Sequence, residues 1–179
     1  MAAKEKAAGG IPSKPAEKGA SQQSTRIAEP ERDLVVTCII DAPRALVFQA
    51  WSDAKHLARW WGPAGWTNPV CEVDLRPGGV MKIVMRSPDG VEHPMRAVFQ
   101  EVVPLERIVF ITSVFEDEKG VAALEVHNTV TFADQNGKTN LIMHARVLKA
   151  TPQVAGAVAG MQQGWTQSLD RLAAHVTNQ

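Results

Sequence analysis

The sequence predicts an α+β domain in which a curved antiparallel sheet of about six to seven strands wraps around a long C-terminal helix. Three observations carry this prediction. A β-branched run opens near residue 34, apolar residues then recur with a period of two over residues 67–148, and a helical period follows to the end of the chain. The connections between the expected strands are short, which favours antiparallel pairing.

The first expected element is a strand, and two short helices follow it. Residues Leu34–Ile40 are rich in β-branched side chains, as strands are. Pro43 fits the first turn of the first helix. Ser52 is the expected N-cap of the second helix, which ends where Gly62 and Pro63 interrupt the pattern.

Six further strands are expected after the short helices. The breaks between them have turn chemistry, such as the Pro-Gly-Gly run at 77–79 and the Asn-Gly pair at 136–137. An antiparallel sheet of this kind has one face to bury. The expected strands are Thr67–Leu75, Val80–Arg86, Glu92–Val103, Arg107–Phe115, Ala123–Ala133 and Thr139–Leu148.

A single long helix is expected at the C-terminus, with Thr151 as its cap and Pro152 at its first position. At about 25 residues it would span roughly 37 Å, which is enough to cross the whole sheet. Because a strongly curved sheet cannot contact a straight helix along its full length, we expect space between them. One apolar stripe faces the sheet: Val154, Val158, Met161, Trp165, Leu169, Leu172 and Val176.

The composition narrows the possible compartments and partners. Among 179 residues there are 19 Lys and Arg and 19 Asp and Glu, so a nucleic-acid or anionic-membrane partner is not expected. No apolar run approaches the roughly 20 residues of a membrane span. No hydrophobic segment follows Lys4 and Lys6 as a secretory signal would require. We therefore expect a cytoplasmic protein without membrane insertion.

The chain is expected to contain one domain, over residues 33–179, preceded by a disordered tail. Residues 1–32 are rich in Ala, Gly, Lys, Glu, Ser and Pro, and they cannot bury enough apolar surface to order themselves. The two cysteines, Cys38 and Cys71, lie in apolar strand-like runs without metal-ligand spacing. They predict neither a metal site nor a disulfide framework, and no cofactor is expected.

Several segments together resemble one known family. In order along the chain they are Ala42-Pro43 through Trp51, Arg59-Trp60-Trp61-Gly62-Pro63, Val73-Asp74-Leu75-Arg76-Pro77-Gly78-Gly79, Val103 to Phe110, and Gly160-Met161-Gln162-Gln163-Gly164-Trp165. This series resembles the Aha1-like (Hsp90-ATPase-activator homologue) branch of the START/Bet v 1, or SRPBCC, superfamily. The resemblance implies a helix-grip fold with a deep, mostly apolar cavity between the long helix and the sheet.

The resemblance implies several functions, and fold alone does not choose among them. Members of the superfamily bind lipids, polyketides, flavonoid-like molecules or hormones. Some cyclise polyketides, and eukaryotic Aha1 relatives bind Hsp90, so a role in stress response is also implied. The leading hypothesis is binding of a small hydrophobic molecule without catalysis. The alternatives are a polyketide-cyclase-like enzyme and an Hsp90-type co-chaperone; the oligomeric state, monomer or dimer, stays open.

The expected cavity wall consists of large or flexible apolar side chains that alternation turns inward. Methionine and tryptophan suit such a wall, because methionine adapts to irregular shapes and tryptophan brings a large apolar area. Asp74 and Arg76 flank the Pro-Gly-Gly turn, as a charged pair at the cavity mouth or as an ion pair that stabilises the turn. The expected lining is Trp60, Trp66, Met81, Ile83, Met95, Phe99, Phe110, Met143, Met161 and Trp165.

Candidate acid and base groups are few. His127 and His144 could face each other on neighbouring strands and form an acid/base or metal site. Glu101 shares its alternation phase with Met95 and Phe99, so it is expected inward, where a carboxyl would have a raised pKa. The sequence has no nucleophile elbow, no phosphate-binding glycine loop and no obvious Cys-His pair, which favours binding over catalysis.

Overall fold

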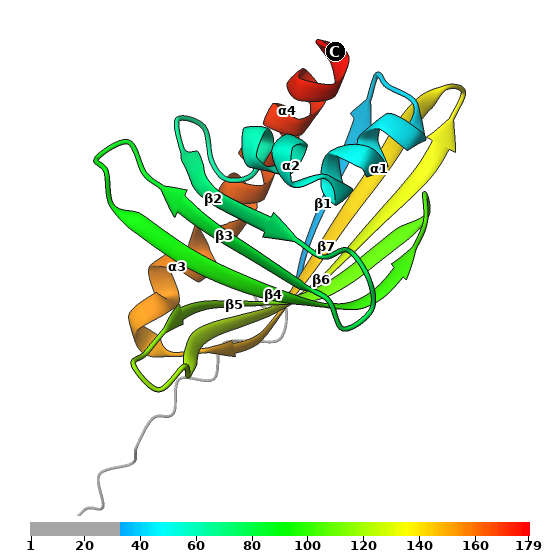
Figure 1. The fold of residues 1–179 in the computed structure, drawn as a ribbon. Coiled ribbons are helices and arrows are strands. Elements are labelled where there is room, and N and C mark those ends of the chain that lie inside the picture. Colours follow the sequence, from blue (N-terminus) through cyan, green and yellow to red (C-terminus); the bar gives the residue numbers. More distant parts are fainter. Residues whose placement is uncertain (1–32) are drawn as a thin grey trace, which may run out of the picture.

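The computed structural model describes residues 33–179, and the tail expected over residues 1–32 lies outside them. Figure 1 shows one sheet, two short helices at one end of it, and a C-terminal helical segment that the sheet encloses. The elements are β1 (Asp33–Ile40), α1 (Arg44–Ser52), α2 (Ala54–Trp60), β2 (Thr67–Val73), β3 (Val80–Arg86), β4 (Glu92–Val103), β5 (Arg107–Glu116), β6 (Ala122–Gln135), β7 (Lys138–Ala150), the 3-10 turn η2 (Pro152–Val154), α3 (Ala155–Ala159) and α4 (Met161–Thr177).

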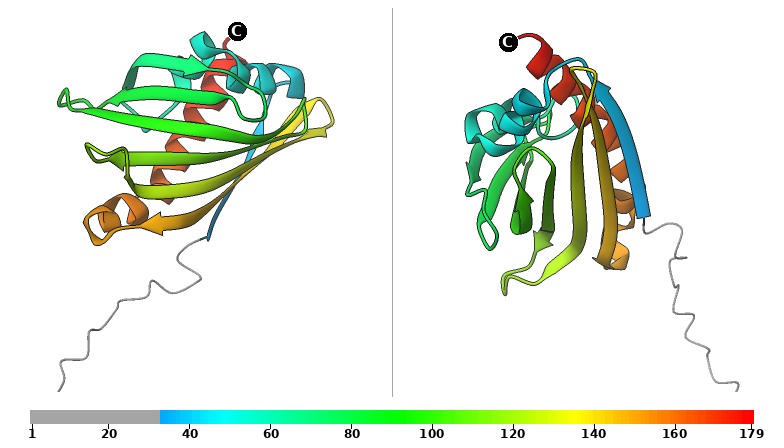
Figure 2. Two further views of the ribbon diagram at one scale, coloured as in Figure 1. Left: turned by 60° about the horizontal axis from the view of Figure 1, so that its bottom comes forward. Right: turned by 90° about the vertical axis from the view of Figure 1, so that its right-hand side faces the viewer.

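The sheet has seven strands in the order β1-β7-β6-β5-β4-β3-β2. Every pair is antiparallel. Strands β2 to β7 form a meander of neighbours in sequence, and β1 joins its far edge, where Val36 lies opposite Met143. The views in Figure 2 show the sheet curving around α4. The predicted curved antiparallel sheet around a C-terminal helix is therefore confirmed.

The starts of the two short helices differ from the prediction. Pro43 occupies the N-cap position of α1 rather than its first turn. The cap of α2 is Asp53, whose Oδ1 accepts hydrogen bonds from the backbone N–H groups of Lys55 at 2.7 Å and His56 at 3.3 Å. Ser52 instead ends α1, and its hydroxyl donates back to the carbonyl of Gln49, because serine in a helical turn readily bonds to the preceding turn.

The C-terminal helix is broken, whereas the sequence predicted one continuous helix of about 25 residues. The turn η2 and the short helix α3 come first, and α4 begins after Gly160 with 17 residues, about 25 Å at the usual rise. At Gly160 φ is −84° and ψ is −6°, away from the regular helix. Glycines at 156, 160 and 164 lower the helix propensity of this stretch, so the continuous helix that the apolar period predicted was wrong.

The core lies between the inner face of the sheet and α4, and a tryptophan cluster closes it at the end of α1 and α2. The Trp51 ring lies 4.8 Å from that of Trp60 and stacks with Trp165 of α4 at 6.3 Å. Trp60 is fully buried, and its indole N–H donates to the carbonyl of Ala50 at 2.9 Å. Leu169 and Leu172 of α4 complete this core. The cluster therefore joins α1, α2 and α4.

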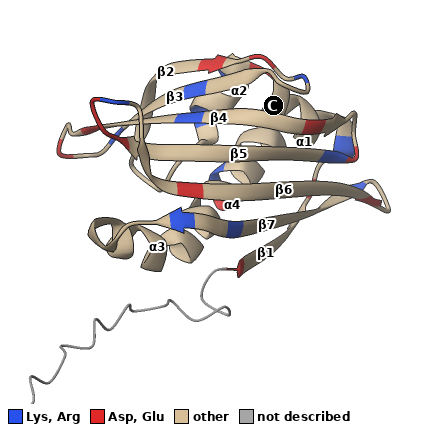
Figure 3. Cartoon of the chain, turned by 90° about the horizontal axis from the view of Figure 1, so that it is seen from below, with Lys and Arg blue, Asp and Glu red and all other residues tan. Residues whose placement is uncertain are grey.

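The outer face of the sheet carries charges of both signs. Lys82 lies opposite Arg96, and His127 lies opposite Arg146. Figure 3 shows Lys and Arg positions interspersed with Asp and Glu positions over the strands and loops. The inner positions of the same strands are mostly apolar and carry no charged side chain among the buried residues of this region, so charge and burial separate by strand alternation.

Candidate functional site

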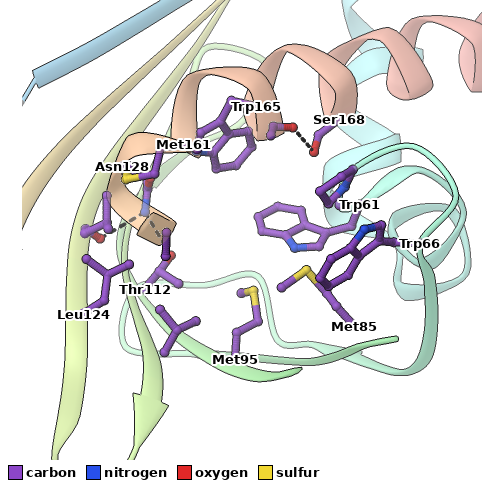
Figure 4. A pocket seen from close by; sticks show the side chains of 17 residues that line it. Trp61, Trp66, Met85, Met95, Thr112, Leu124, Asn128, Met161, Trp165 and Ser168 are labelled. Atoms are coloured by element: carbon purple, nitrogen blue, oxygen red, sulfur yellow. Dashed lines mark hydrogen bonds between the residues drawn. The ribbon is translucent and has the colours of Figure 1, made fainter. Parts of the chain in front are cut away.

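One cavity of about 350 Å³ remains between the sheet and the C-terminal helices. Figure 4 shows tryptophans and methionines around it, with polar side chains at a few points. None of the lining residues found within 33–179 is charged. The lining residues are Trp61, Gly62, Pro63, Trp66, Met85, Met95, Thr112, Val114, Leu124, Val126, Asn128, Ala157, Gly160, Met161, Gly164, Trp165 and Ser168.

The loop between α2 and β2 forms one wall of the cavity and is held by Arg171 of α4. The Arg171 guanidinium donates to the carbonyls of Trp61 at 3.1 Å, Gly62 at 2.9 Å and Pro63 at 2.8 Å. A fourth bond reaches the carbonyl of Arg59 at 3.0 Å. Burial lowers the pKa of Arg171, yet a guanidinium stays protonated in proteins. Its charge therefore neutralises the carbonyl end of α2.

The helical wall recedes because two of its residues lack side chains. Gly160 and Gly164 both line the cavity. A Cβ atom added to Gly164 would meet no heavy atom within 4 Å. The hydroxyl of Ser168 donates to the Gly164 carbonyl at 2.8 Å, one turn back along the helix. These glycines leave open a volume that leucine or methionine would otherwise fill.

The sheet wall contains a buried amide. Asn128 is 1% exposed, and its Nδ2 donates to Thr112 Oγ1 at 2.9 Å and to the Val126 carbonyl at 3.0 Å. Its Oδ1 is buried and accepts no hydrogen bond from the described residues. Figure 4 shows Asn128 and Thr112 together on the side of the cavity away from Trp61 and Trp66. The cavity therefore has an aromatic end and a polar end.

The ten residues predicted to line the cavity divide into two groups. Trp66, Met95, Met161 and Trp165 line it. The others are buried in the core and do not reach this cavity: Trp60, Met81, Ile83, Phe99, Phe110 and Met143. Alternation identified the strand residues among these ten as inward-facing, but it does not say which part of the inner face another element covers.

Several lining residues were not among those predicted. Thr112 and Asn128 stand at inward positions of β5 and β6, where the neighbours of Asn128 in the same phase are Val126 and Val130. An asparagine among valines at the inward positions of one strand could therefore have been recognised from the sequence. Met85 shares the alternation phase of Met81 and Ile83 on β3, so the sequence carried that signal too. Trp61, Gly164 and Ser168 were also missed, since their places depend on how the loop and the broken helix pack.

Asp74 and Arg76 form an exposed ion pair away from the cavity wall. Arg76 Nε lies 2.9 Å from Asp74 Oδ2, and the two side chains are 53% and 68% exposed for Asp74 and Arg76 respectively. The turn between them and β3 is constrained, because a Cβ on Gly79 would lie 2.0 Å from the Asp74 carbonyl oxygen. Gly78 and Gly79 also exchange backbone hydrogen bonds with Phe99 of β4. This geometry supports a structural role for the turn.

Glu101 does not face the cavity, so its predicted inward position is wrong. A bulge between Phe99 and Glu101 shifts the register of β4 against β5, and the alternation reverses after it. Arg107 Nη2 lies 2.6 Å from Glu101 Oε1. The hydrogen bond and the charge of Arg107 lower the pKa of Glu101, whereas an acid catalyst would need a raised one.

The histidines also lie off the cavity wall. His127 and His144 are not directly opposite, because His127 pairs with Arg146 and His144 pairs with Thr129. His144 Nε2 instead lies 3.3 Å from Asp33 Oδ1. Over residues 33–179 there is no group of three or more His, Cys, Asp or Glu side chains that could hold a metal ion.

An unpredicted histidine pair joins the ends of α2 and α4. His56 Nδ1 and His175 Nε2 are 2.9 Å apart. Burial, with smaller contributions from His56 and Arg59, lowers the pKa of His175. His175 therefore favours the neutral imidazole, and the pair links the two helices without contributing to the cavity.

The enclosed helix, the curved sheet and the cavity between them define a helix-grip protein of the SRPBCC class. Residues 41–177 match the family described as "Activator of Hsp90 ATPase homolog 1-like protein". The chain belongs to this family, which confirms the resemblance seen in the sequence.

Solved structures of bacterial proteins share the fold. A solution structure from Arthrobacter aurescens has 21% identity and a TM-score of 0.74, over 85% of this chain and 90% of that one. A crystal structure from Nitrosomonas europaea has 23% identity and a TM-score of 0.69, over 84% and 97%. The AHSA1 protein from Silicibacter pomeroyi has 25% identity and a TM-score of 0.67, over 81% and 97%.

No curated protein matches this sequence. Among the helices of residues 33–179, none has the length and apolar character needed to span a membrane.

Proposed function

We propose that the protein binds a small, mostly apolar molecule in the cavity between α4 and the sheet, without catalysis. The observation that carries this proposal is the cavity itself. About 350 Å³ stays open beside a core in which Trp60, Phe110 and Met143 are fully buried. Ligand pockets have volumes of roughly 300–1,000 Å³ and walls that are mainly apolar and aromatic.

The chemistry of the wall favours binding over catalysis. Its polar side chains are Thr112, Asn128 and Ser168, and none of them titrates near neutral pH. Glu101 and His144, the groups that a cyclase-like reaction was expected to use, lie elsewhere, where Glu101 pairs with Arg107 and His144 contacts Asp33. An apolar ligand would gain affinity from buried area, at about 25 cal/mol per Å² before the costs of association.

The test is a titration with N-phenyl-1-naphthylamine, an uncharged fluorescent probe, combined with thermal unfolding. Saturable fluorescence enhancement and a concentration-dependent rise in Tm are expected. The variant Gly164→Leu places a side chain in the open space of the cavity. Leucine also has a higher helix propensity than glycine, so this variant should unfold at a higher temperature and bind the probe at least tenfold more weakly, roughly 1.4 kcal/mol.

Gly156→Leu is the matched control. Gly156 is also helical, an added Cβ there meets nothing within 4 Å, and the residue does not line the cavity. This variant should bind the probe like the wild type. If Gly164→Leu binds as well as Gly156→Leu, or if no apolar probe saturates, the cavity is not the binding site. The interaction with an Hsp90-type chaperone that the family name suggests would then become the hypothesis to test.

A further inference from the structure

We infer that the cavity selects an uncharged ligand carrying a hydroxyl or N–H group, which donates a hydrogen bond to Asn128 Oδ1. This inference rests on the proposed binding function and specifies the chemistry of the ligand. Its basis is an amide acceptor that the fold buries in the cavity wall without a partner.

The orientation of the Asn128 amide is fixed by its neighbours. The Val126 carbonyl can only accept, so the NH₂ group must face it. The second amide hydrogen points to Thr112 Oγ1. Exchanging the amide oxygen and nitrogen would place two acceptors against each other at the Val126 carbonyl. Both donors of Asn128 are thus used, and the acceptor Oδ1 is the group left for a ligand.

Burial makes this unpaired acceptor significant. Asn128 is 1% exposed, and most buried polar side chains have at least one hydrogen-bond partner. A buried acceptor without a partner destabilises the folded protein, since its hydration is lost and not replaced. A ligand donor at this wall would restore the missing bond, so an apolar molecule with a donor should bind better than one without.

Thr112 adds a second polar contact at the same end of the cavity. Its Oγ1 accepts from Asn128, and its own hydroxyl hydrogen is not used in any hydrogen bond found among residues 33–179. Thr112 also lines the cavity. A ligand hydroxyl can donate to Asn128 and accept from Thr112 together, so a hydroxyl fits this pair better than a group that can only donate.

The wall also selects against anions. In the described part of the chain, no Lys, Arg or His lines the cavity. Arg171 lies near its loop wall, but its guanidinium is engaged with four backbone carbonyls. A carboxylate entering the cavity would lose its hydration and meet the acceptor Oδ1 without a cation. The alcohol or phenol of a given carbon skeleton should therefore bind better than its carboxylate.

The test compares ligands that share a skeleton and differ in one group. Calorimetric or fluorescence titrations at pH 7 would use 2-naphthol, 2-methoxynaphthalene and 2-naphthoate, and in parallel 1-decanol, 1-methoxydecane and decanoate. The hydroxyl compound should bind roughly five- to tenfold more tightly than its methyl ether, as expected for one hydrogen bond to a buried acceptor. The carboxylate should bind more weakly than both.

Two variants assign the effect to Asn128. Asn128→Leu has the same number of side-chain heavy atoms in the same branched arrangement and no acceptor, so it should bind the hydroxyl compound and the methyl ether equally. Asn140→Leu is the matched control, because Asn140 also has a buried Oδ1 without a partner but does not line the cavity. This control should keep the wild-type preference.

Three outcomes would overturn the inference. Equal affinity of the wild type for the hydroxyl compound and its ether would refute the donor preference and leave apolar binding in place. A preference that survives in Asn128→Leu would assign it to another group. If none of the six compounds binds, the proposed function fails and the inference fails with it. The affinities of the wild type for the hydroxyl compound and its methyl ether test the donor preference even if Asn128→Leu does not fold.

Discussion

Arg171 shows how one residue can hold a cavity wall from outside it. Its guanidinium bonds to carbonyls of residues 59, 61, 62 and 63, at the point where α2 ends and the Trp-Gly-Pro loop begins. The last carbonyls of a helix have no partner within the helix. Asn68 contributes two more bonds, to the carbonyls of Ala58 and Trp61. The loop geometry therefore depends on a side chain more than 100 positions away.

Replacing this arginine should weaken both the fold and the site. Arg171→Leu is expected to lower the free energy of unfolding by about 2 kcal/mol, because it removes charge-assisted hydrogen bonds and leaves partly buried carbonyls unpaired. Urea titration measures this loss. Arg76→Leu is the control: its exposed pair with Asp74 should contribute little. Equal losses in the two variants would show that the four carbonyl contacts of Arg171 are not important for stability.

At the scale of elements, the residue that caps α2 in the structure is the neighbour of the one that the sequence predicted. The sequence favoured Ser52 as the cap, whereas the structure gives that role to Asp53. Both residue types are good caps. The choice depends on where α1 ends, and sequence patterns locate helix ends only to within a residue or two.

Substitution can decide between these two caps. Asp53→Ala should lower Tm by a few degrees, Asp53→Asn should retain most of the stability, and Ser52→Ala should have little effect. Bonds from the Lys55 and His56 N–H groups lower the pKa of Asp53 below its usual 3.8. The ionised cap thus stabilises the fold above that pH, and its contribution is lost as the pH falls through the lowered pKa. Thermal unfolding between pH 2 and 7 should show the wild type approaching Asp53→Ala in acid; a larger effect of Ser52→Ala would contradict the structure.

At the scale of the whole molecule, strand patterns predicted the architecture but only part of the cavity lining. Period-two alternation placed β3 and β4 with the observed bounds, because one buried face imposes a strict phase on each strand. The alternation of inward and outward side chains breaks at the bulge in β4, so Glu101 faces outward where the pattern predicted inward. Sequence patterns also do not predict a cavity, since an empty region depends on what is absent, such as the side chain of Gly164.

The two cysteines provide a test of the molecule as a single folding unit. Cys38 lies on β1 and Cys71 on β2, the opposite edge strands of the sheet. Both thiols are free. Burial raises the pKa of Cys38, and it raises the pKa of Cys71 from 9.0 to about 11. Because the thiolate is the reactive form, Cys71 should react at pH 8 at least roughly 100-fold more slowly in the folded protein than in urea.

Ligand binding should slow the chemical labelling of the cysteines on both edge strands, although neither cysteine lines the cavity. If labelling by a disulfide reagent requires global unfolding, a ligand that binds only the folded state slows it by the factor 1 + [L]/Kd, about 100-fold at 100 times Kd. The measurement is the labelling rate of each cysteine at pH 8, with and without 2-naphthol. Gly164→Leu should lose this protection, and Gly156→Leu should keep it. Protection of one cysteine alone would show that the other is labelled through a local opening of its strand that leaves the ligand bound, and that the sheet does not open as one unit.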